Sequence, residues 1–190
     1  MAKKQTGSFL PPGYQPPKSK TNYLNKFPQG ETKFRILSNP IMGYVGWKDK
    51  KPIRRRTIEE MKDIVFDKSM YNQTGAPDYF WAMVIWNYNE SCVQILELTK
   101  LSIMTKITEL ANDPDWSSPV GYDIKVTRSG EGKKTIYSTN PMPHKDLTEE
   151  IKKVVKENPT DLEALFKGEN PFQSSSDLMD DIANQPAIPF

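Results

Sequence analysis

Residues 78–88 (DYFWAMVIWNY) constrain the fold more than any other segment of the chain. Large apolar side chains occupy both alternating sets of positions in this segment. Successive side chains of a strand point to opposite faces of a sheet, so the pattern predicts a central strand that is buried on both faces. Asn89-Glu90-Ser91 predicts a turn, and residues 92–98 (CVQILEL) predict the hairpin partner of the central strand. The core is therefore expected in the middle of the chain.

Other segments predict further strands and one clear helix. Polar and apolar residues alternate, as in half-buried strands, in residues 31–37, 121–128 and 133–139. The apolar residues of 101–111 recur at helical spacing until Asn112-Asp113-Pro114 ends the helix. Residues 57–78 predict a short amphipathic helix followed by a loop. In the last hairpin, the phase puts Ile136 on the apolar face and Tyr137 on the opposite face with Lys125.

The order of these elements predicts a mainly β fold. A strand is followed by a long basic insertion at residues 43–56, two strands, a helix and two more strands. This is the order of an OB-fold, a five-stranded barrel with a helix between the third and fourth strands. The insertion reads as a basic β-ribbon with its turn at Asp49-Lys50-Lys51. In an OB-fold, the first inter-strand loop and the loop between the last two strands flank an oligonucleotide site.

Composition divides the chain into four regions. Only 36% of the residues are hydrophobic and 16 are prolines, so part of the chain is expected not to fold. We predict a flexible basic arm (1–22), an OB-fold domain (23–145), short C-terminal helices (146–168) and a disordered acidic tail (169–190). The tail contains four acidic residues and no Lys or Arg, which leaves +6 for the rest of a chain whose net charge is +2. This asymmetry suggests a body that binds a polyanion and a tail that binds proteins or competes for the basic groove.

The expected compartment is the reducing cytoplasm. Cys92 is the single cysteine, which excludes an intramolecular disulfide and a cysteine-cluster zinc site. We find neither the apolar run of a signal peptide nor a stretch of about 20 apolar residues that would span a membrane.

Basic and aromatic residues cluster in two places, which predicts a single-stranded nucleic-acid site. Cations follow the phosphates of such a strand, and bases stack on aromatic faces. The ribbon supplies Tyr44, Trp47, Lys48, Lys50, Lys51, Arg54, Arg55 and Arg56. The last hairpin supplies Lys125, Arg128, Lys133 and Tyr137, and Trp81 of the central strand is a further candidate. The competing interpretations are a solvated ribbon with Trp47 packed on the barrel, and core packing of Trp81.

Catalytic patterns are weak in this sequence. Pro114-Asp115 followed by Glu131-Gly132-Lys133 matches the spacing of a metal-dependent nuclease family, but Asp115 follows a helix end and Glu131 lies at a hairpin tip. His144 has no evident serine or cysteine partner, and no glycine-rich phosphate loop is present. We therefore predict a protein that is not an enzyme and has no metal or cofactor.

Two segments resemble known single-stranded DNA-binding proteins. The end of the chain, with Asp177, Asp180 and Asp181 before Ile188-Pro189-Phe190, resembles the acidic C-terminal peptide of the bacterial proteins. Here residues 184–187 separate the acids from the Ile-Pro-Phe end, unlike the usual bacterial arrangement. The body resembles phage-encoded single-stranded DNA-binding proteins in residues 27–37 (FPQGETKFRIL), Trp47, 51–54 (KPIR), 95–98 (ILEL), 115–116 (DW) and 121–124 (GYDI). No zinc-ligand set of the kind found in some phage relatives is present.

The resemblance implies a sequence-independent single-stranded DNA-binding protein in phage DNA replication, recombination or repair. The implied partners are single-stranded DNA and, through the tail, replication or recombination proteins. Three alternatives remain open from the sequence: an OB-fold protein that binds RNA, a metal-dependent nuclease, and a replisome adaptor with incidental DNA affinity.

Overall fold

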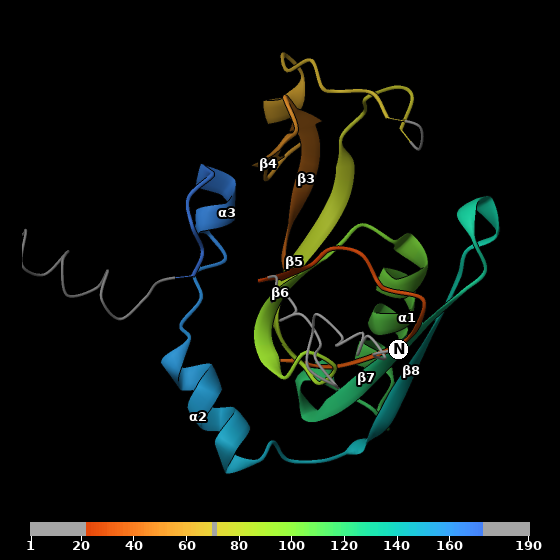
Figure 1. The fold of residues 1–190 in the computed structure, drawn as a ribbon, viewed down its shortest axis with the longest axis vertical. Helices are drawn as coiled ribbons and strands as arrows, with labels where there is room; N and C mark the ends of the chain where they lie inside the picture. The colour runs from red at the N-terminus through yellow and green to blue at the C-terminus, as the bar shows by residue number, and fades with distance from the viewer. Residues whose placement is uncertain (1–21, 70–71, 173–190) are drawn as a thin grey trace, which may run out of the picture.

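The computed structural model describes residues 22–69 and 72–172. This part of the chain is mainly β, with a mixed eight-stranded sheet and a few short helices (Figure 1). The strands are β1 (Tyr23–Leu24), β2 (Gly30–Ile36), β3 (Ile41–Lys48), β4 (Lys51–Arg55), β5 (Asp78–Asn87), β6 (Cys92–Leu98), β7 (Tyr122–Ser129) and β8 (Ile136–His144). The α-helices are α1 (Leu101–Asn112), α2 (Glu149–Glu157) and α3 (Ala164–Lys167), and short 3-10 turns lie at Glu59–Met61, Pro119–Gly121 and Gly132–Lys134.

The sheet runs in the order β1-β6-β5-β2-β7-β8, with β3 and β4 as a branch. β5 is long enough to pair with two strands along one edge: its last residues pair with β2 and its first residues pair with β3. β6 pairs with β5 along the other edge. β1 adds to β6 in parallel, which makes the sheet mixed. No ladder joins β8 to β6 or β1 in the described residues, so the sheet is not closed. The predicted mainly β architecture and short helices are confirmed at this level.

β5 is buried on both faces, as its sequence predicts. Met83 and Ile85 face a large core cluster built by β2, β6, β7, α1 and the segment around Phe27. Phe80 and Ala82 face a second cluster that includes Leu162 and Leu165 of the C-terminal segment, with Phe166 packed against it. Figure 1 shows α1 on one side of β5 and β6, and α2 and α3 on the other.

A buried ion pair joins β2 to β7, and its arginine also binds the chain just after β8. Arg35 of β2 and Asp123 of β7 meet at 2.7 Å, with side chains 3% and 4% exposed. Arg35 also donates a hydrogen bond to the carbonyl oxygen of Lys145, beyond β8. The hydroxyl of Tyr88 donates to Asp123 at 2.9 Å. Burial, assisted by the Asp123 carboxylate, raises the pKa of Tyr88 to about 12.

Two local predictions are wrong. The amphipathic helix expected in 57–78 is only a 3-10 turn at Glu59–Met61, and Val65 is 82% exposed. The chain leaves that turn so that Phe66 can cover Gly46 of β3, where its ring lies 2.5 Å from the position a Cβ would take. The phase of the last strand is also reversed. Gly132–Lys134 forms a 3-10 turn, β8 begins only at Ile136, and Ile136 is 66% exposed while Tyr137 packs on the large cluster.

Candidate nucleic-acid interface

The β3–β4 hairpin and Arg56 after it, which together we call the ribbon (residues 41–56), extend from the sheet beside β5. Its turn is Asp49–Lys50, and both residues have positive φ, as a type I′ turn in a two-residue hairpin requires. Trp47 lies opposite Pro52 and is 45% exposed. Part of the Trp47 ring is therefore accessible, and the alternative in which Trp47 packs on the barrel stays a prediction.

The cations of the ribbon fall into two groups. Lys48, Lys50 and Lys51 are exposed at the ribbon tip, which we define as residues 47–51. None of these lysines forms an ion pair with a residue in 22–69 or 72–172. Their charge is therefore open to a ligand.

The arginines at the ribbon base, residues 54–56, are engaged within the protein. Arg54 pairs with Glu97 of β6 at 2.6 Å, and the two side chains are 10% and 7% exposed. Arg55 donates hydrogen bonds to the carbonyl oxygens of Arg54 and Phe166. Arg56 pairs with Glu163 and lies 4.6 Å from the centre of the Phe166 ring. Protein acids and carbonyls thus offset the repulsion of the three consecutive arginines, and a role of these arginines in binding nucleic acid stays a prediction from the sequence.

The β7–β8 hairpin holds the second predicted cluster. Arg128 lies opposite Tyr137 and donates to the carbonyl oxygen of Phe27 at 3.0 Å. Tyr137 packs edge-on against the ring of Phe27. Lys133 is exposed in the 3-10 turn at the hairpin tip. Lys125 pairs with Glu31 at 2.9 Å across the sheet, away from Arg128 in the alternation of β7.

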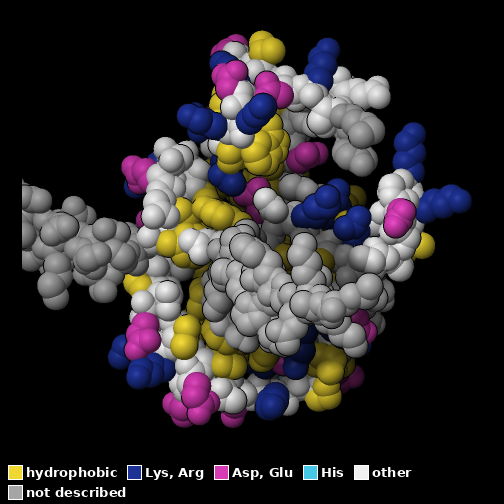
Figure 2. Space-filling view, viewed as in Figure 1, with side chains coloured by type: hydrophobic (Ala, Val, Ile, Leu, Met, Phe, Trp, Pro, Cys, Tyr) yellow, Lys and Arg dark blue, Asp and Glu magenta, His cyan; other side chains and the backbone are white. Residues whose placement is uncertain are grey.

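Three adjoining hollows connect the ribbon tip to this hairpin, and together we call them the groove. The largest, about 610 Å³, is lined by Lys26, Lys100, Arg128 and Tyr137 among others. It shares Lys100 with a hollow of about 460 Å³ that reaches Trp47. It shares Asn25 with a third hollow, of about 400 Å³, that Trp47 also lines. Figure 2 shows Lys and Arg side chains gathered between the ribbon and the tip of the β7–β8 hairpin.

The groove unites part of the predicted site and adds residues that the sequence did not indicate. It brings together Trp47, Arg128 and Tyr137, which lie far apart in the chain. Lys26 and Lys100 are additions: both are exposed, and neither has an ion-pair partner among the described residues. Each is an isolated lysine in a connecting segment, so no sequence pattern distinguishes it. Only the fold places them in one groove.

Two predicted aromatic residues lie elsewhere. Tyr44 is on the opposite face of the ribbon from Trp47, because their positions differ by an odd number, and it contacts Tyr79 edge-on at 5.4 Å. Trp81 packs against the large core cluster, where its indole N–H is buried without a hydrogen-bond partner among the described residues. The core-packing interpretation of Trp81 is therefore the better one.

The residues of the weak nuclease pattern are exposed and lie on separate elements. Asp115 is in the turn after α1, and Glu131 precedes the 3-10 turn between β7 and β8. Within residues 22–69 and 72–172, no group of three or more His, Cys, Asp or Glu side chains is placed to hold a metal ion. Nor does this part of the chain contain a helix long and apolar enough to cross a membrane.

Residues 1–21 of the predicted arm and residues 173–190 of the predicted tail lie outside the described residues. This applies to Asp177, Asp180, Asp181, Ile188, Pro189 and Phe190, whose role stays a prediction from the sequence. The chain matches no family model, no curated protein and no solved structure.

Proposed function

We propose that this protein binds single-stranded DNA in the groove between the ribbon tip and the β7–β8 hairpin, without sequence specificity and without catalysis. The observation that carries the proposal is that three neighbouring hollows share lining residues, which places exposed Trp47 at one end of the groove and Arg128 and Tyr137 at the other. Lysines that have no ion-pair partner within residues 22–69 and 72–172 line it or flank it, so phosphates can supply the missing charges. Trp47 presents a face on which a base can stack, which contributes about 1–3 kcal/mol per base in such proteins.

We further propose that β2, β5, β6, β7 and β8 form an OB-type barrel. Three observations support this: β2 pairs with both β5 and β7, α1 lies between the third and fourth of these strands, and one apolar cluster is shared by β2, β5, β6, β7 and α1. The ribbon then follows the first strand, and the β7–β8 hairpin joins the last two. These are the positions that flank the oligonucleotide site in OB-folds.

For the biological role, the resemblance to phage single-stranded DNA-binding proteins supports DNA replication, recombination or repair inside the host cell. The acidic end with Ile188-Pro189-Phe190 suits a peptide that recruits partner proteins, because Phe190 can fill an apolar pocket and its carboxylate can pair with a cation.

A fluorescence titration tests the binding proposal. We expect single-stranded oligonucleotides to bind more tightly than duplexes, with an affinity that falls as salt rises. Lys100→Ala should weaken binding, whereas Lys156→Ala on the exposed side of α2, the matched change of charge, should not. Equal affinity for single strands and duplexes, or no salt dependence, would contradict the proposal. Tighter binding of a matched RNA oligomer would instead favour the RNA-binding alternative.

A further inference from the structure

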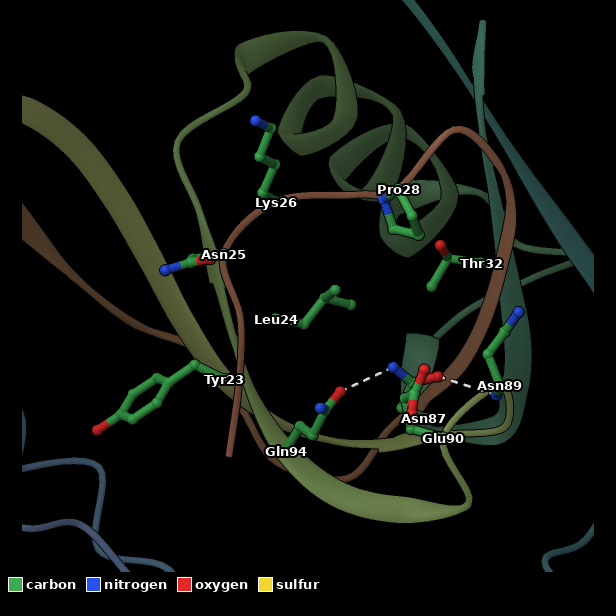
Figure 3. A pocket seen from close by; sticks show the side chains of 10 residues that line it. All are labelled: Tyr23, Leu24, Asn25, Lys26, Pro28, Thr32, Asn87, Asn89, Glu90 and Gln94. Carbon is green, nitrogen blue, oxygen red and sulfur yellow. Dashed lines mark hydrogen bonds between the residues drawn. The ribbon is translucent and has the colours of Figure 1, made fainter. Parts of the chain in front are cut away.

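A polar pocket opens beside the groove, at the end of the sheet where the chain enters β2. Its volume is about 460 Å³, within the range of small-ligand sites. It is lined by the segment around β1, by β2 and by the β5–β6 turn (Figure 3). It shares Lys26 with the largest hollow of the groove, and Tyr23 and Asn25 with the hollow that reaches Trp47. A strand in the groove therefore passes its entrance.

The inner wall of this pocket is made of neutral polar side chains. Asn87 and Gln94 are 3% and 2% exposed, and the Asn87 amide donates to Gln94 Oε1 at 2.7 Å. The backbone N–H of Asn89 donates to Asn87 Oδ1 at 2.9 Å, which holds the Asn87 amide in one orientation. A primary amide carries two N–H groups, so this geometry leaves Asn87 a second hydrogen to donate. Figure 3 shows this pair on one side of the pocket and Thr32 on another.

Thr32 supplies the observation that points to a ligand. Its side chain is only 1% exposed, and its Oγ1 is buried with no hydrogen-bond partner in the described residues. A buried hydroxyl without a partner destabilises a fold, and a valine would fill the same space without that penalty. A ligand that hydrogen-bonds to this hydroxyl would explain its presence.

The available groups define the chemistry of that ligand. The hydroxyl of Thr32 and the free N–H of Asn87 can both donate, and the charged Lys26 and Glu90 lie nearer solvent than the buried wall. The pocket is thus suited to a neutral ligand with carbonyl acceptors. Thymine and cytosine carry a carbonyl at O2 and guanine carries one at O6, whereas adenine has none.

We propose that this pocket receives one unstacked base that carries a carbonyl group, which is any base but adenine, with its carbonyl oxygen between Thr32 and Asn87. The inference rests on the proposed function, because the groove must deliver the strand to the pocket. Lys26, at the boundary of pocket and groove, is placed to meet the phosphate beside that base. The protein would then bind all single strands but prefer those that offer a carbonyl-bearing base, rather than adenine, at this position.

The test compares oligonucleotides of about 16 nucleotides, the upper end of the range that one OB domain covers, made of dT, dC or dA. Affinities are measured by fluorescence anisotropy for the wild type and for Thr32→Val. One lost hydrogen bond should weaken dT and dC binding about 2- to 12-fold and leave dA binding unchanged. The control is Thr139→Val, which changes a buried threonine on a different strand, β8. It should leave all three affinities unchanged.

The comparison separates the pocket from ordinary stacking preferences, because a dT over dA preference caused by stacking alone would persist in Thr32→Val. If Thr32→Val keeps the dT to dA and dC to dA affinity ratios of the wild type, the pocket proposal is wrong while the groove proposal stands. Failure of the wild type to bind any of the three overturns the proposed function and the pocket together. An NMR measurement on the wild-type protein tests the pocket without relying on a variant that has to fold. The side-chain amide resonances of Asn87 should shift on addition of dT and not of dA, and equal responses would contradict the pocket.

Discussion

The tip and the base of the ribbon carry the same kind of charge but use it differently. Lys48, Lys50 and Lys51 at the tip have no acidic partner in the described residues, whereas Arg54 and Arg56 at the base pair with Glu97 and Glu163. Buried Arg54 contributes to holding the ribbon against the sheet, whereas the exposed lysines are the cations that we propose to meet a polyanion. A basic run in a sequence can therefore combine cations that pair within the fold with cations that have no such partner in the described residues.

The largest expected effect is on stability, from Arg54→Ala at the ribbon base. This change leaves the Glu97 carboxylate buried without its partner, which costs about 3–5 kcal/mol in the free energy of unfolding. Urea denaturation measures it. Lys51→Ala at the tip is the matched control and should stay within about 0.5 kcal/mol of the wild type. Similar costs for the two variants would remove the distinction between tip and base.

Trp47→Ala should mainly affect DNA binding, whereas Arg54→Ala should mainly affect stability. Loss of one stacking face should weaken single-stranded DNA binding by about 1–3 kcal/mol, or about 5- to 160-fold. Because the Trp47 side chain is 45% exposed, the free energy of unfolding should change far less than in Arg54→Ala. Oligonucleotide titration and urea denaturation of the same preparation give both values. A stability loss without an affinity loss would show that Trp47 serves the fold.

The salt dependence of binding sharpens the comparison further. Each phosphate contact that is lost from a single strand should reduce the slope of log K against log salt by about 0.7. Replacing Lys48, Lys50 and Lys51 together by Gln should therefore lower the slope by up to about 2. Arg56→Gln should leave it unchanged, because Glu163 already pairs with Arg56. A larger change for Arg56→Gln than for the triple variant would reverse our assignment.

The smallest effect concerns another charge engaged within the fold, Asp123. Tyr88 donates a hydrogen bond to Asp123 and has its pKa raised from 10.0 to about 12. Since the folded state holds this proton more tightly than the unfolded state, the contribution is complete below about pH 10 and is lost as the pH rises to about 12. Tyr88→Phe should thus make unfolding free energy fall less steeply over this window. An unchanged pH profile in urea denaturation would show that Tyr88 does not titrate this way.

Local patterns predicted the central part of the fold well. β5, β6 and α1 follow their sequence patterns closely, because burial on both faces and helical spacing leave a strong periodic signal. The helix predicted after Arg56 was wrong because Phe66 packs on Gly46, a contact between residues distant in the sequence that no local pattern shows. The predicted phase of β8 was wrong because the residues of the 3-10 turn at Gly132–Lys134 continue the alternating pattern of a strand.

The site was less predictable than the fold. The ribbon and the last hairpin were recognisable from their basic and aromatic residues, but the partners of the arginines were not. Arg54 and Glu97 are 43 residues apart, and Arg56 and Glu163 are 107 apart, so no local pattern reveals which cations are already paired. The same reason hides Lys26 and Lys100, which only the sheet topology brings into the groove.

Photo-crosslinking of an oligothymidylate strand, followed by mass spectrometry of the linked peptides, tests the central claim most directly. The two faces of the ribbon offer the decisive contrast, because Trp47 lines the groove and Tyr44 contacts Tyr79 on the other side. We predict crosslinks at Trp47 and Tyr137, the aromatic residues at the two ends of the groove. Crosslinks confined to Tyr44 and Tyr79 would contradict the account and move the bound strand to the opposite face.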